Sequence, residues 1–313
     1  MGKYIKDCFC CRSKDIRKLI SVKKFPYFTT PIDIKSKSKI VNSNKKKNYF
    51  DNLNLKYCNK CSHVFLSKLP NLKIINELYS KYYNYPSAML GNFIPSRDVE
   101  FVNFFKKYLN KKKAKNTSSF YEIGCYDGYI LYNLRSEGYA NISGCDPSSG
   151  ADIGKKFGIK IDKSFFSLNQ KNIKYKKFDY IIARHLVEHL ENPKQFFNDL
   201  KKISHEKTKV VIEVPNGEFY IKNGLLEVFS HQHIHLFSRF SMSMLIKQTD
   251  FFIEDAIVSN ANLYFILSIN KTKKIFVKQK LIKPFMKNYN NKIIEIAKNV
   301  KKFKNKKINF YGA

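Results

Sequence analysis

Tryptophan is absent from this 313-residue sequence, and both arginine and acidic residues are scarce. Only 25 Asp and Glu residues oppose 58 Lys and Arg residues, which gives a formal net charge of +33. Because most of the basic residues are lysines, few bidentate contacts with phosphates or bases are available. The lysines are widely spread, which favours a solvated surface. An anionic partner, either a nucleic acid or a negatively charged small molecule, stays an open alternative.

Long hydrophobic runs are also missing, and the N-terminus lacks the apolar stretch of a signal peptide. A helix that spans a bilayer needs about 20 mostly apolar residues. We therefore expect no contact with a membrane and a cytoplasmic protein. The hydrophobic fraction of 43% is ordinary for a chain with a packed core, and the length predicts two or three domains.

Four of the seven cysteines form two C-x-x-C pairs near the N-terminus. In a reducing compartment such pairs favour a metal over disulfides, and two of them complete a tetrahedral Zn²⁺ site. We expect a structural zinc in a small, turn-rich domain over residues 1–70, with His63 as a possible substitute ligand. The predicted ligands are Cys8, Cys11, Cys58 and Cys61.

From residue 118 onward, short apolar runs alternate with helical patterns. This alternation predicts an α/β fold with a parallel, doubly wound, Rossmann-like sheet. The expected strands are 119–124, 142–146, 159–161, 178–183 and 209–214, with a closing hairpin over 251–258 and 263–269. The expected helices are 71–82, 97–112, 129–137, a short one that ends at 157, and 193–204.

We expect four parts along the chain. The zinc domain over 1–70 is followed by a helical connector over 71–117, a cofactor-binding domain over 118–270, and a Lys-rich helical segment over 271–313 that contains a new strand at 308–311. In the connector, Ser96 is the expected N-cap of the second helix. Its expected apolar stripe consists of Val99, Val102, Phe105 and Leu109.

A loop with two glycines follows the first strand of the expected sheet, from Glu122 to Gly128. Tyr126 occupies the place of the middle glycine in a dinucleotide fingerprint, which argues for a ligand without a pyrophosphate, such as S-adenosylmethionine (SAM). The next strand ends at Asp146, whose carboxylate can accept both ribose hydroxyls. The predicted cofactor-binding residues here are Glu122, Gly124, Cys125, Asp127, Gly128, Asp146 and Pro147.

The stretch from Arg184 to His189 matches H-x-x-E-H, an inverted zinc-protease pattern. That pattern needs both histidines on one helix, whereas this stretch begins in a strand. We therefore interpret the match as coincidental. Because the stretch follows the fourth strand, we expect Arg184 and His185 to line the cofactor site.

Three of the seven histidines lie between Ser230 and His235. A neutral imidazole suits a general base near neutral pH. Their alternating spacing would put all three rings on one face of an extended segment, which also suits a metal. A purely structural polar loop is the third interpretation.

Together these residues resemble the sugar C-methyltransferases that act on nucleotide-linked deoxysugars. In that family a four-cysteine zinc domain precedes a SAM-binding domain, and a further Rossmann-like domain follows. The glycine loop resembles the family's E-I-G-x-N-D-G, Asp146–Ser148 its D-P-S, and Tyr83–Ser87 its aromatic-Ser connector. The stretch His231-Gln232-His233 resembles its H-E-H, which implies His233 as the general base with His231 in support.

Three positions depart from the family pattern: Tyr126 replaces an Asn, Gln232 an acid, and Ser230 a Tyr. The acceptor and the methylated atom are therefore open. The ending Phe310–Ala313 resembles the opening of the family's C-terminal domain, so we expect the chain to stop where that domain begins.

The sequence thus predicts a SAM-dependent methyltransferase that methylates a nucleotide-linked sugar at carbon. One alternative is an O- or N-methyltransferase acting on another small metabolite. Another is an RNA-binding methyltransferase or binding module, supported by the charge and the zinc domain. A third is a cofactor-binding remnant without activity. The oligomeric state is not predicted.

Overall fold

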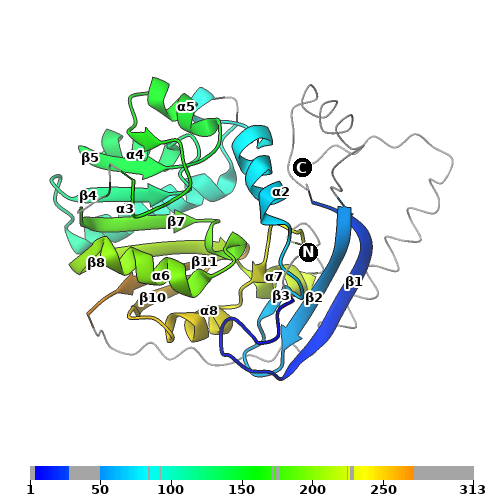
Figure 1. Ribbon diagram of the computed structural model, residues 1–313. Helices are drawn as coiled ribbons and strands as arrows, with labels where there is room; N and C mark the ends of the chain where they lie inside the picture. The colour runs from blue at the N-terminus through cyan, green and yellow to red at the C-terminus, as the bar shows by residue number, and fades with distance from the viewer. Residues whose placement is uncertain are drawn as a thin grey trace.

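The computed structural model describes residues 4–27, 50–83, 85–91, 93–170, 173, 176–223, 225 and 229–270. Within these residues the chain forms a seven-stranded and a four-stranded sheet (Figure 1). The predicted helical segment and strand after residue 270 lie outside the described residues. No helix in the described part is long and apolar enough to cross a membrane.

The larger sheet has the strand order β10-β11-β8-β7-β4-β5-β6. The five strands from β8 to β6 are parallel, and the hairpin of β10 and β11 joins them antiparallel. Chain order reverses between β4 and β7, and in such sheets ligands bind at the carboxyl ends of the strands beside this switch point. The strands are β4 (Ser119–Ile123), β5 (Asn141–Cys145), β6 (Ile161–Asp162), β7 (Phe178–Arg184), β8 (Ser204–Pro215), β10 (Phe252–Val258) and β11 (Asn262–Ser268).

Helices cover both faces of this sheet because its strands send alternate side chains to opposite sides. On one face, Phe120 and Tyr180 pack with α3, α4 and α5. On the other, Tyr121 and Ile181 pack with α6 and α8. The predicted doubly wound α/β sheet is confirmed. The helices are α3 (Ser96–Lys112), α4 (Tyr129–Ser136), α5 (Gly150–Lys156), α6 (Pro193–Lys202), α7 (Gly217–Asn223) and α8 (Arg239–Ile246).

The smaller sheet has the order β1-β2-β3-β9 and is antiparallel throughout. Its first three strands come from the N-terminal region: β1 (Ile16–Pro26), β2 (Phe50–Cys58) and β3 (Val64–Leu66). The fourth, β9 (His235–Leu236), comes from the chain after the fifth parallel strand. The cysteine-bearing region and the larger sheet therefore share one hydrophobic cluster.

A connector of short helices links the two sheets along the chain (Figure 1). It contains α2 (Leu72–Glu77), the π-helical η1 (Leu78–Tyr82) and the 3₁₀ turn η2 (Ala88–Leu90). The expected helix over 71–82 is thus present, although its second half widens into a π-helix. A further 3₁₀ turn, η3 (Val187–His189), follows β7.

Three local expectations were wrong. Residues 1–70 are not mainly turns, because β1 and β2 form a long antiparallel pair. Helix α3 begins at Ser96 with Pro95 as its N-cap, so Ser96 is not the cap. Val99, expected in the apolar stripe of α3, is 42% exposed, and Phe101 is buried in the core instead.

Candidate active site

The four predicted zinc ligands come together in the structure. Their sulfur atoms all lie within 4.8 Å of one another, and the Sγ atoms are 3.5 Å apart in both the Cys8–Cys61 and the Cys11–Cys58 pairs. A tetrahedral site with Zn–S bonds of about 2.3 Å places its sulfurs about 3.8 Å apart, so the arrangement fits a zinc ion. All four residues are at least partly buried.

Two nearby residues, Cys10 and His63, do not belong to this four-cysteine group. Burial raises the pKa of the Cys10 thiol, which favours its protonated form over a metal-binding thiolate. His63, the possible substitute ligand, instead places its Nε2 3.1 Å from Nδ1 of His235.

The glycine loop turns sharply at the carboxyl end of β4. Gly124 and Gly128 have φ angles of +74° and +73°, in the left-handed region that glycine adopts without strain. Between them, Cys125 is buried and Tyr126 has a φ of +48°. The predicted residue Glu122 is only 2% exposed, and burial raises its pKa well above the usual range, although the nearby Arg184 opposes this change.

Asp146 directly follows β5 and contacts the backbone of the glycine loop. Its Oδ2 accepts a hydrogen bond of 3.0 Å from the backbone N–H of Tyr126, and its Oδ1 accepts one of 2.9 Å from the N–H of Ser148. Burial raises the pKa of Asp146, although these hydrogen bonds oppose the change. The predicted ribose acceptor and the glycine loop are therefore held together, with Pro147 in the turn between Asp146 and Ser148.

Asp127 fastens the glycine loop to the connector. Its Oδ2 accepts hydrogen bonds from the Ser87 hydroxyl (2.7 Å) and the Met89 backbone N–H (3.1 Å), and its Oδ1 accepts one from the N–H of Tyr129. With 3% of the residue exposed, this carboxylate has three donors and little water. Asp127 therefore holds the glycine loop against the connector, and its contact with a cofactor stays a prediction.

Arg184 ends β7 inside a buried ion network. Its Nε lies 2.5 Å from Oε2 of Glu213, its Nη2 lies 2.9 Å from Oδ1 of Asp98, and its guanidinium stacks on the ring of Phe101. Although burial opposes ionisation, Arg184 lowers the pKa of Glu213 to about 2. Arg184 therefore has a structural partner on each side, in addition to its predicted place beside the cofactor.

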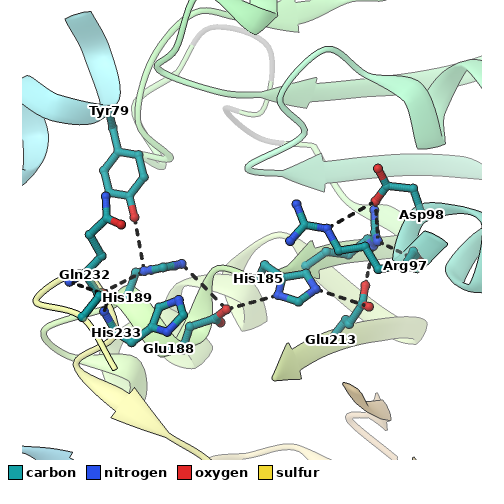
Figure 2. Close-up of polar contacts among 11 residues, drawn as sticks. Tyr79, Arg97, Asp98, His185, Glu188, His189, Glu213, Gln232 and His233 are labelled. Carbon is teal, nitrogen blue, oxygen red and sulfur yellow. Dashed lines mark hydrogen bonds and ion pairs between the residues drawn. The ribbon is translucent and has the colours of Figure 1, made fainter. Parts of the chain in front are cut away.

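His185 is the first residue after β7 and has a φ of +46°, an uncommon backbone conformation for a side chain with a Cβ. Its Nδ1 lies 3.5 Å from Glu188 and its Nε2 3.4 Å from Glu213 (Figure 2). Burial opposes protonation of this imidazole, yet the Glu213 charge raises its pKa overall. His185 thus connects the ion network to the loop that contains η3.

The three histidines between residues 230 and 235 do not share one face, so that expectation was wrong. His231 stacks on Tyr27 with ring centroids 4.5 Å apart and contacts the carbonyl of Phe25 through its Nε2 at 3.2 Å. His235 contacts His63. The His233 ring lies against His189 at the end of the larger sheet, with 4.8 Å between the two ring centroids.

The structure adds residues that the sequence analysis had set aside. Glu188, His189 and His233 offer ligand atoms that all lie within 4.8 Å of one another, and we call them the Glu-His-His cluster. Figure 2 shows the three side chains converging below Tyr79. The signal for Glu188 and His189 was present in the H-x-x-E-H match, but their partner His233 is distant in sequence.

A row of tyrosines links this cluster to the glycine loop. The Tyr79 hydroxyl lies 3.2 Å from Nδ1 of His189, and the Tyr79 and Tyr83 rings are 5.6 Å apart between centroids. Tyr83 in turn packs edge-to-face on Tyr126, again at 5.6 Å. The cluster and the predicted cofactor loop therefore border one aromatic wall supplied by the connector.

A mostly parallel sheet with a glycine loop and an acidic residue beside its switch point defines a Rossmann-like domain suited to a nucleoside-bearing cofactor. A family model described as "Methyltransferase domain" matches residues 97–255. The match spans half of the chain, so the chain belongs to this methyltransferase family, and it is a SAM-dependent methyltransferase.

Comparisons with individual proteins show only distant similarity. A SAM-dependent methyltransferase from Clostridium acetobutylicum is 10% identical over 64% of this chain and 98% of that one, with a TM-score of 0.45. One from Aquifex aeolicus is 14% identical over 57% and 100% of the two chains, with a TM-score of 0.43. The plantazolicin methyltransferase BpumL in complex with SAH is 17% identical over 56% and 85%, with a TM-score of 0.45. No curated protein sequence matches the chain.

Proposed function

We propose that this methyltransferase transfers the SAM methyl group to a carbon atom of a nucleotide-linked sugar. The observation that carries the proposal is the position of His233. It lies against His189 at the end of β7, and a wall of tyrosines separates it from the loop of Tyr126. An acceptor lying along this wall would face the cofactor on one side and an imidazole on the other.

The residues at the strand ends would hold the cofactor. Asp146 would accept the ribose hydroxyls, and the positive-φ glycines Gly124 and Gly128 would let the backbone approach the ligand. When bound, SAM supplies an electrophilic methyl group on its sulfonium. The protein must then align the acceptor with that methyl group and remove one proton from the acceptor.

His233 is the proposed base for that proton. A neutral imidazole accepts a proton near neutral pH, and the buried carboxylate of Glu188 nearby would stabilise the resulting positive charge. His231, the predicted helper, packs against Tyr27. We therefore propose that it supports the base by fixing the loop and that it does not contact the acceptor. The net charge of +33 favours an anionic acceptor such as a nucleotide sugar.

A structural zinc in the four-cysteine group is the second part of the proposal. Thiolates from two C-x-x-C turns fit a closed tetrahedral site with no position left for a substrate. The zinc would hold the start of the chain against the turn between β2 and β3. Removing it with a strong chelator should lower the melting temperature, and an unchanged melting temperature would contradict this part.

The acceptor is tested by incubating the protein with labelled SAM and a panel of nucleotide-linked sugars. With the best acceptor, His233→Ala should reduce turnover by about 10²–10⁴-fold, the usual contribution of a general base. SAM affinity should stay close to that of the wild type because the base contacts the acceptor.

His205→Ala is the matched control, since His205 lies at the opposite end of β8 and pairs with Asp179 at 3.2 Å. Its turnover should equal that of the wild type. Transfer to no sugar in the panel, or wild-type turnover by His233→Ala, would overturn the respective part of the proposal.

A further inference from the structure

The carboxylate of Glu188 is buried without the hydrogen bonds that such a group normally has. The residue is 1% exposed, and neither of its oxygens accepts a hydrogen bond within the described part of the chain. Its near neighbours are imidazole nitrogens, at 3.5 Å for His185 Nδ1 and 3.7 Å for His189 Nε2. A buried charge at such distances calls for a closer positive partner.

His189 has a fixed ring orientation that turns one nitrogen toward this carboxylate. Its Nδ1 lies 2.8 Å from the backbone carbonyl oxygen of Gln232. Because a carbonyl only accepts, Nδ1 carries the proton, and in the neutral ring Nε2 presents its lone pair to Glu188. Metal-binding histidines typically have this arrangement, with the far nitrogen donating to a backbone carbonyl.

The distance between Nε2 of His189 and Oε1 of Glu188 is 3.7 Å. This is too long for a hydrogen bond. It is close to the separation of about 3.4 Å between two ligands of a tetrahedral metal with bonds of about 2.1 Å. Two lone pairs facing each other across this gap repel, and a cation between them would turn the repulsion into two favourable contacts.

His233 supplies a third ligand atom within 4.8 Å of the other two. It comes from a different loop, and that loop is fixed to η3 from both sides. On one side is the His189–Gln232 contact, and on the other Nε2 of His235 lies 2.9 Å from the carbonyl of Leu190. The cluster is therefore held by the fold before any ligand arrives.

We infer that Glu188, His189 and His233 bind one divalent cation of the first transition row, such as Zn²⁺ or Fe²⁺. Two imidazoles and one carboxylate favour these metals over Mg²⁺ and Ca²⁺, which prefer oxygen ligands. Three protein ligands leave coordination positions for an oxygen of a bound molecule, unlike the closed four-cysteine group.

The inference deepens the proposed function and rests on it only for the place of the acceptor. With the cation bound, the ring nitrogen of His233 is a ligand and does not act as the base. Bound there, the cation would polarise an acceptor oxygen and lower the pKa of the adjacent proton, and a hydroxide at an open coordination position would accept that proton and become water. Metal-bound and metal-free protein would thus remove the acceptor proton in different ways.

Metal content tests the site without any acceptor. The full chain is incubated with a small excess of Zn²⁺, desalted and subjected to elemental analysis. Glu188→Gln and His189→Ala should each contain one equivalent of zinc less than the wild type, while the control His205→Ala should contain the same amount as the wild type. Circular dichroism establishes that each variant is folded. Because the two variants change different positions, the test still works if one of them misfolds.

Equal zinc content in the wild type and both cluster variants overturns the inference, because only the four-cysteine group or the surface would then bind zinc. A deficit of one equivalent in the cluster variants supports it, even if no sugar is ever methylated. Failure of the proposed acceptor and failure of the metal site are therefore separate results.

Discussion

Replacing Asp146 with alanine should weaken SAM binding while the protein stays folded. In the structure this carboxylate is 8% exposed and accepts hydrogen bonds from the backbone N–H groups of Tyr126 and Ser148. The replacement removes the proposed acceptor of the ribose hydroxyls. It also leaves the backbone N–H groups of Tyr126 and Ser148 without their acceptor.

The expected size follows from the charge on the lost partner. A hydrogen bond to a charged group contributes about 1.5–3 kcal/mol, and at about 1.4 kcal/mol per tenfold change this corresponds to a rise in Kd of about 10- to 150-fold. The loss of the acceptor for these two backbone N–H groups should also lower the free energy of unfolding by about 1–3 kcal/mol each.

Isothermal titration calorimetry with SAM measures the affinity, and urea denaturation measures the stability. Asp152→Ala is the matched control, since Asp152 lies in the neighbouring helix α5, with its side chain 48% exposed, and pairs with Lys163 at the surface. Its SAM affinity should equal that of the wild type. Wild-type affinity in Asp146→Ala would remove Asp146 from the cofactor site.

Three further outcomes follow from buried groups. Arg184→Leu should lower the free energy of unfolding by about 3–5 kcal/mol, because the buried Glu213 loses its guanidinium partner and keeps only the more distant His185. Urea denaturation measures this loss, and a value below 1 kcal/mol would contradict the network. Gly154→Ala should cost about 1–3 kcal/mol by the same assay, because a Cβ there would meet the Asp127 carbonyl oxygen at 2.5 Å. Burial lowers the pKa of His235 from 6.5 to about 3, so only the unfolded chain binds a proton there between these values. Stability should therefore fall as the pH drops from 6.5 towards 3, and His235→Phe should flatten this slope in denaturation curves at several pH values.

The parallel sheet could be predicted because its signals are local. The buried strand β7 contains the apolar run 180–183. The glycines that end the helices before β5 and β6 adopt positive φ, with values of +92° at Gly138 and +75° at Gly158. These residues stop a helix whatever the rest of the chain does. The cysteine pairs were informative for the same reason, since each is a short-range pattern.

The N-terminal sheet could not be predicted in the same way. Strand β1 contains two pairs of adjacent basic residues, Arg17-Lys18 and Lys23-Lys24, which interrupt the alternation expected of a strand. Its extended form comes from pairing with β2 along most of its length. Strand β9 has only two residues and exists through its pairing with β3, so no local pattern indicates it.

The Glu-His-His cluster shows the same limit at the site. The stretch from His185 to His189 is not a helical H-x-x-E-H motif, since His185 directly follows strand β7 and lies outside the cluster. What completes the cluster is His233, which arrives from a loop after β8. The packing of that loop against η3 brings His233 to Glu188 and His189. The spacing of the residues along the chain does not indicate this packing.

Strand β9 has a consequence for how the protein is made. During synthesis β1, β2 and β3 emerge early, but the last strand of their sheet ends at Leu236. Until then, the free edge of β3 has unpaired backbone groups that can pair with another chain. Because β4 to β8 precede β9 in the chain, the ribosome releases most of the larger sheet before the first sheet is complete. Contacts this distant in sequence also form slowly. A nascent chain arrested before residue 235 should therefore aggregate more readily than one arrested after residue 270, outside the exit tunnel in both cases.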